Sequence, residues 1–252
     1  MWYSVALLAP LYFVLDIRAS NLSISDNIET IVSTFQKGRE LAESGIPLDA
    51  LITELNQIEP RYRSVAFEGA SMGVTLTQDF GTWKQYAKAA EKHAAQVHIG
   101  LGWAIKPPKS PEGGLDLAST LSQIETEYHV KVLDGYGYWN GLFQRRATIR
   151  TQQVPENITP EYQAGFDQGV GRAIWYISKG EVAKVMNIIN HFSEERRLNL
   201  WRGIGVALTY VGGCSDELIA ELKSVAGEFK LNLEKGIEAG VESMEKAKTR
   251  QQ

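Results

Sequence analysis

Pairs of closely spaced glycines recur along most of this 252-residue chain at a nearly constant interval. The first members of the pairs are Gly69, Gly100, Gly135, Gly169, Gly203 and Gly236. The intervals between them are 31, 35, 34, 34 and 33 residues, and a period of this length is typical of units that contain two helices. The repeat therefore predicts an all-α, single-domain fold built from about six helical-hairpin repeats of roughly 34 residues.

Local signals also favour helices. Ser215, followed by Asp216 and Glu217, is typical of a helix start, and Leu218 and Leu222 follow it at one-turn spacing. Residues 107–114 and 154–160 are rich in turn-forming residues and are expected to be linkers. Alternating strand-type runs are scarce, which agrees with an all-α fold.

The position of the glycines suggests how the helices are arranged. Each glycine costs up to about 1 kcal/mol relative to alanine inside a helix, so close backbone approach, or room for a side chain or ligand, must offset that cost. We interpret the glycine-bearing helices as the inner ring of an α/α barrel, or toroid, over residues 21–252. An open solenoid is the alternative, because the last unit, with Glu238, Glu242 and Glu245, is polar enough to cap one.

Composition and charge limit the partners and the cellular compartment expected for the protein. The net charge of −4 makes nucleic acid an unexpected partner, and the lone cysteine, Cys214, excludes an internal disulfide framework and favours the cytoplasm. Cys214 is interpreted as a small buried or cap-adjacent residue, with a reactive thiol as the alternative.

Residues 1–20 include an apolar run, Trp2 to Leu15, that lacks a basic leader and is too short to span a bilayer. We expect this segment to pack on the domain; peripheral contact with a membrane surface is the alternative.

Three acidic residues lie beside the glycine pairs and are candidates for catalysis. They are Glu68, Asp134 and Asp167, each with an apolar residue directly before it. Burial there would raise the pKa of a carboxyl and keep it protonated near neutral pH, as a general acid requires. Helix capping is the alternative role for each of them.

Aromatic residues gather around the same motifs. Their faces stabilise a passing carbocation without attacking it, and a dry wall protects such a cation from water. The residues expected to line the cavity and bind substrate are Trp103, Tyr138, Trp139, Phe143, Phe166, Arg172, Trp175, Tyr176, Trp201 and Tyr210.

Other chemistries have little support in the sequence. It has no phosphate-binding loop and no D-D-x-x-D run, and its four histidines are not spaced as zinc ligands. Two functions remain as candidates: cation chemistry started by protonation, and simple binding of an apolar ligand. We expect neither a metal nor a cofactor.

The linked motifs resemble a bacterial family. The segments that carry the resemblance are residues 67–73, 134–137, 166–175 and 200–205, and the similarity spans roughly residues 20–245. They are similar to the family known as enediyne biosynthesis proteins, which includes the monodomain class II terpene cyclases of meroterpenoid pathways. The resemblance implies a helical-barrel enzyme that protonates the terminal alkene of a linear isoprenoid substrate, such as a prenylated hydroxybenzoate, and cyclises it without a cofactor.

The resemblance also implies an acid, but the D-x-D-D motif that class II cyclases generally carry is missing here. Asp134 is the first choice for the acid because of its aromatic surroundings, with Asp167 second and Glu68 third. Tyr136, His98 and Asn140 are the candidates for orienting that acid. Arg172, with Arg145 and Arg146, is a candidate for holding an anionic head group; pairing with surface acids is the alternative.

Two further functions remain open. A non-catalytic carrier for a hydrophobic polyene metabolite would share the cavity but need no proton donor. A helical-repeat interaction module would be expected if the repeats formed an open arc.

Overall fold

The computed structural model describes residues 22–106 and 114–249, and these residues are almost entirely helical. Apart from one isolated β-bridge between Ile105 and Leu115, the described residues form helices, turns and loops. The predicted all-α fold is therefore confirmed. The predicted apolar segment at residues 1–20 lies outside the described residues.

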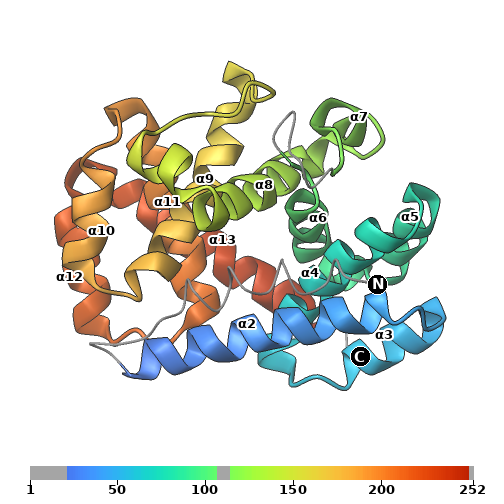
Figure 1. The fold of residues 1–252 in the computed structure, drawn as a ribbon. Coiled ribbons are helices and arrows are strands. Elements are labelled where there is room, and N and C mark those ends of the chain that lie inside the picture. The colour runs from blue at the N-terminus through green and yellow to red at the C-terminus, as the bar shows by residue number, and fades with distance from the viewer. Residues whose placement is uncertain (1–21, 107–113, 250–252) are drawn as a thin grey trace.

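Seven long helices carry the glycines and form the inside of the molecule. They are α2 (Leu22–Glu43), α4 (Pro60–Thr77), α6 (Ala94–Trp103), α8 (His129–Phe143), α9 (Pro160–Ser178), α11 (Glu194–Val211) and α13 (Lys230–Thr249). Each packs against the next in this order, and further contacts join α2 to α11 and α4 to α13. In Figure 1, α2 runs along one edge and α8 along the opposite edge, with α4 and α6 on one side between them and α11 on the other. These helices therefore surround a common interior.

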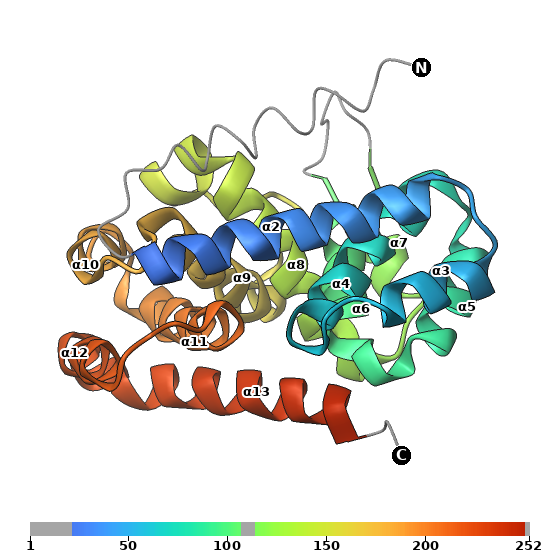
Figure 2. The same ribbon diagram turned by 90° about the horizontal axis from the view of Figure 1, so that it is seen from below.

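Shorter helices lie outside this inner set. They are α3 (Leu48–Asn56), α5 (Phe80–Ala89), α7 (Leu117–Leu121), α10 (Val182–Ile189) and α12 (Asp216–Ala226). Short 3₁₀ segments precede α6, α8 and α13, namely η1 (Glu91–His93), η2 (Thr126–Tyr128) and η4 (Gly227–Phe229). In Figure 2, α13 lies along one edge of the molecule, with α11 and α12 next to it.

The glycines allow the inner helices to touch backbone to backbone. A Cβ added to Gly169 of α9 would lie 1.9 Å from the Asp134 carbonyl oxygen of α8. In the same pair of helices, a Cβ on Gly137 would lie 1.9 Å from the Phe166 carbonyl oxygen. Since no side chain fits in such a gap, close backbone approach is the reason for glycine at these positions.

Burial explains why the inner helices lack a simple amphipathic pattern. In α8 every residue from Val132 to Leu142 is buried, because the helix is covered on all sides. The helix ends follow local rules: Asp79 caps α5 by accepting a hydrogen bond from the Thr82 N–H, and Pro160 occupies the first turn of α9.

The repeat is less regular than its glycine spacing suggests. Helix α2 joins the inner set with only Gly38, and α8 is followed not by an outer α-helix but by a π-helical turn, η3 (Arg146–Arg150). The closed toroid of six similar units stays a prediction. Between residues 22 and 249, none of the helices described has the combined length and apolarity needed to cross a bilayer.

Candidate functional site

Two positions of the glycine motif point into the common interior. One is the residue just before the first glycine, occupied in three of the units by the buried Glu68, Asp134 and Gln168. In the α11 unit this residue is Arg202, which is exposed. The other directly follows the second glycine, and there Trp103, Tyr138 and Arg172 occur in successive units. In α8 and α9 the two positions are four residues apart, so their side chains lie on the same helix face. This register brings the polar and aromatic candidates together.

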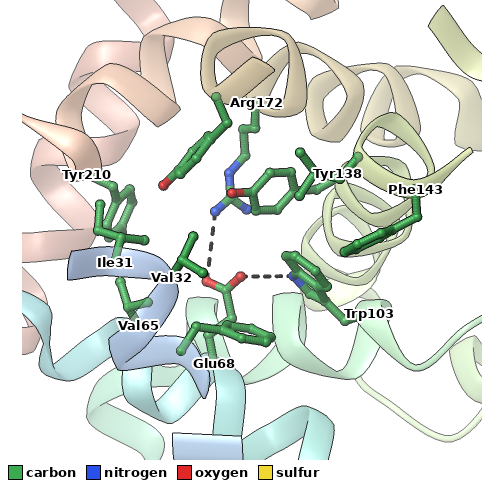
Figure 3. A pocket seen from close by; sticks show the side chains of 12 residues that line it. Ile31, Val32, Val65, Glu68, Trp103, Tyr138, Phe143, Arg172 and Tyr210 are labelled. Atoms are coloured by element: carbon green, nitrogen blue, oxygen red, sulfur yellow. Dashed lines mark hydrogen bonds and ion pairs between the residues drawn. The ribbon is translucent and has the colours of Figure 1, made fainter. Parts of the chain in front are cut away.

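A cavity of about 40 Å³ lies where these side chains meet. It is lined by Ile31, Val32, Phe35, Val65, Glu68, Trp103, Tyr138, Leu142, Phe143, Arg172, Tyr176 and Tyr210. These residues come from α2, α4, α6, α8, α9 and α11, so six of the inner helices contribute to one wall. Figure 3 shows Glu68 and Arg172 facing each other across this space. The cavity has room for a few water-sized groups and no more.

The Glu68 carboxyl is the acid of the cavity wall. The residue is 4% exposed, and its Oε1 accepts a hydrogen bond from Trp103 Nε1 at 3.0 Å. Burial raises the pKa of Glu68 to about 7; the charge of Arg172 opposes that rise, and Asp134 adds to it. A large fraction of the carboxyl is therefore protonated at neutral pH.

Asp134 has a different environment, although it holds the same motif position. Its Oδ1 lies 2.7 Å from Arg172 Nη1, and its Oδ2 accepts a hydrogen bond of 2.5 Å from Gln168 Nε2. Arg172 Nη2 is 3.8 Å from Glu68 Oε2. The shorter ion pair therefore joins Arg172 to Asp134, and Asp134 does not line the cavity.

Asp167 faces away from this group. Its carboxylate pairs with Arg196 of α11, with Nη2 at 2.5 Å and Nε at about 3.0 Å from its oxygens. Arg196 also donates to the Gln152 carbonyl, so the pair ties α9 and α11 to the chain before α9. Burial raises the pKa of Asp167, while Arg196 opposes that rise. The geometry is that of a buried structural ion pair.

The residues expected to bind substrate divide into two groups. Six line the cavity: Trp103, Tyr138, Phe143, Arg172, Tyr176 and Tyr210. The other four are buried elsewhere: Trp139, Phe166, Trp175 and Trp201. Among these, Trp139 lies beneath the Lys106 ammonium, 3.7 Å from its ring centroid, and Phe166 packs edge-on against Tyr136.

The residues expected to orient the acid lie away from the three carboxyls. The Tyr136 hydroxyl donates to Asn157 Oδ1 at 3.2 Å, and Asn140 Nδ2 donates to the Tyr136 carbonyl at 2.8 Å. His98 stacks on Tyr128 and bonds the Ala94 carbonyl through Nδ1.

The contacts to the carboxyls come instead from Trp103, Gln163, Gln168, Arg172 and Arg196. The sequence could have indicated a role for Gln168, because it holds the same motif position as Glu68 and Asp134. Arg196 lies outside the motif, so the motif does not indicate its role.

The remaining candidates are placed as follows. Two nitrogens of Arg145, Nε and Nη2, are buried without a hydrogen-bond partner, whereas Arg146 is exposed. Cys214 is half-buried, and burial raises the pKa of its thiol to about 11, so the thiol is protonated at neutral pH. Among the residues that the structure describes, no three His, Cys, Asp or Glu side chains gather as metal ligands would.

The fold and the site together define an all-α protein with a protonatable carboxyl in an aromatic cavity. The chain belongs to the family described as "Protein of unknown function (DUF1702)", whose model matches residues 14–252. No curated protein and no solved structure matches the chain.

Proposed function

We propose that this protein is a class II cyclase that protonates the end of a linear prenyl chain, and that Glu68 is its general acid. The observation that carries the proposal is the buried Glu68 carboxyl, with a pKa of about 7, in the wall of an apolar and aromatic cavity. A general acid works best when its pKa lies near the working pH. Asp134 and Asp167 are each held by an arginine within 2.7 Å, and neither lines this cavity.

In this proposal Glu68 transfers its proton to the terminal alkene of the chain. The alkene π electrons form the new C–H bond and leave a tertiary cation, which the next alkenes attack in turn. The ring faces of Trp103 and Tyr138 stabilise the cation, and the apolar residues of α2 keep water away. Loss of a proton, or capture by an oxygen of the substrate head group, ends the cascade, and Glu68 regains its proton.

The size of the cavity limits how the substrate binds. A volume of about 40 Å³ holds only a few water-sized groups and is too small for a prenyl chain. The proposal therefore requires the wall side chains to move when substrate enters, as enzymes with closed sites commonly do. Prenylated aromatic acids, such as prenylated hydroxybenzoates, are the substrates to try first.

The test is turnover of a prenylated hydroxybenzoate by three matched variants. We expect Glu68→Gln to lower the rate of cyclisation by about 10²- to 10⁴-fold, the range of general acid catalysis. Asp167→Asn, which removes an acid outside the cavity, is expected to retain activity if it folds. The third variant, Asp134→Asn, is expected to keep measurable activity with an altered pH profile.

Full cyclisation by Glu68→Gln would remove Glu68 as the acid. Tight binding of the prenylated acid by the wild-type protein, without conversion, would instead support the carrier for hydrophobic polyenes.

A further inference from the structure

A second hollow lies at the other end of the inner helices. It has a volume of about 520 Å³, within the roughly 300–1,000 Å³ typical of small-molecule sites. We call it the vestibule; its wall includes Gln96, Lys131, Arg202, Glu242, Ser243 and Lys246. Unlike the cavity at Glu68, this wall is rich in charged and polar groups.

The vestibule and the cavity share the same helices. Gln96 precedes Trp103 on α6, and Lys131 precedes Tyr138 on α8, by seven residues in each case. Seven residues of helix rise about 11 Å, or two turns. The two hollows therefore lie at opposite ends of one interior, separated by the layer that contains Asp134 and Gln168.

One hydrogen-bonded group also separates the two hollows. Gln96 Nε2 donates to the Tyr210 hydroxyl, whose ring lines the cavity, and it lies 3.4 Å from the Ser243 Oγ in the vestibule wall. Because these are side-chain contacts between helices, Gln96 and Tyr210 can rotate without moving a helix.

The charges of the vestibule favour an anion. Lys131 is half-buried, and burial lowers the pKa of its ammonium, with the Arg202 charge contributing. Among the described residues, neither Lys131 nor Arg202 takes part in an ion pair. Two acids act on Lys131, and both have other cationic partners: Asp134 pairs with Arg172 at 2.7 Å, and Glu242 pairs with Lys246 at 2.6 Å. The other acids of the wall are Glu91 and Glu127, which lie with Lys92 at the rim formed by η1 and η2.

We propose that the vestibule binds the carboxylate head group of an aromatic acid through Lys131 and Arg202, while the apolar tail passes Gln96 and Tyr210 into the Glu68 cavity. This inference rests on the proposed function, because it names where the head group of that substrate binds. Tyr128, whose ring stacks on His98, also belongs to the vestibule wall. A guanidinium and an ammonium together suit a carboxylate.

The test separates head-group binding from turnover. Binding of free 4-hydroxybenzoate, which has no prenyl tail, is measured by titration calorimetry and by NMR for wild type, Lys131→Met and Arg202→Gln. Lys184→Met on the outer helix α10 is the matched control, because Lys184 is exposed and no residue of α10 belongs to the vestibule wall. We expect the dissociation constant to be about tenfold larger in each vestibule variant and unchanged in the control. Arg202 is exposed, so its variant keeps the test valid if Lys131→Met does not fold.

The possible outcomes test the vestibule site, its preference for a carboxylate and the proposed cyclase function separately. Equal binding by wild type and both vestibule variants would overturn the site, and so would equal binding of the uncharged methyl ester. Stronger binding of inorganic pyrophosphate than of 4-hydroxybenzoate would overturn the carboxylate assignment. If Glu68→Gln binds the head group normally and wild type never cyclises the prenylated acid, the vestibule stands and the proposed cyclase function fails.

Discussion

Glu68 and Asp134 hold the same motif position, but their electrostatic environments differ because Arg172 lies closer to Asp134. Arg172 approaches Asp134 to 2.7 Å and Glu68 only to 3.8 Å. Burial is the main cause of the raised pKa of Glu68, and Asp134 offsets part of the opposing effect of Arg172.

Removing that counter-charge should acidify Glu68. In Asp134→Asn the guanidinium of Arg172 has Glu68 as its nearest carboxylate, so we expect the pKa of Glu68 to fall below about 7. The measurement is an NMR titration of the Glu68 side-chain carboxyl. Asp167→Asn is the control, since its partner is Arg196 and not Arg172. An unchanged Glu68 pKa in Asp134→Asn would contradict this account.

The proposed reaction also predicts a direction of pH dependence. The protonated form of Glu68 is the reactive one, and its pKa is about 7. We therefore expect kcat to level off below that pH and to fall about tenfold for each pH unit above it. Initial rates of cyclisation between pH 5 and 9 check this. A rate that rises with pH across that range would show that a base, not an acid, limits the reaction.

The sequence could predict that these carboxyls are buried but not which of them pairs with an arginine. Glu68, Asp134 and Asp167 stand out beside their glycines, whereas the pairing depends on the distance between α8, α9 and α4. Distances between helices are set by packing, which a single sequence does not report.

At the scale of helices, the glycine motif works as a backbone contact. The α8–α9 pair illustrates this, because Gly137 meets the Phe166 carbonyl and Gly169 meets the Asp134 carbonyl. The contact fixes the rotation of each helix, and that rotation points Glu68, Asp134 and Gln168 inward. The same glycines that build the fold therefore aim the residues of the site.

A methyl group at one of these contacts should separate the helices. Gly137→Ala would place its Cβ 1.9 Å from a backbone oxygen, and we expect a loss of about 3 kcal/mol or more in the free energy of unfolding. Gly45→Ala is the control: its Cβ meets nothing within 4 Å, and its cost of about 1–2 kcal/mol comes from the left-handed backbone alone. Urea denaturation of both variants measures the difference. Equal losses would show that the α8–α9 contact relaxes freely.

The repeat predicted the helices well because each glycine pair marks one inner helix. It did not predict α2 as a seventh member, since α2 has only Gly38, nor the π-helical turn that replaces an outer helix after Phe143. Both departures depend on tertiary packing rather than on local sequence pattern.

For the whole molecule, the buried Glu68 links stability to pH. Its folded pKa, about 7, lies above the value of 4.5 expected in the unfolded chain. The folded state therefore favours the neutral form, and the stability that this contributes is complete below pH 4.5 and is lost as pH rises through 7. A shift of this size corresponds to on the order of 3 kcal/mol.

Comparison with Glu68→Gln isolates this effect from the other titrating groups. His93, whose pKa burial lowers to about 4, changes stability with pH in the opposite sense, and both proteins share it. We expect the wild type to lose stability relative to Glu68→Gln between pH 4.5 and 8, as measured by urea denaturation across that range. Parallel curves would mean that Glu68 is already ionised in the folded protein, and a carboxylate that has lost its proton cannot start a cation cascade.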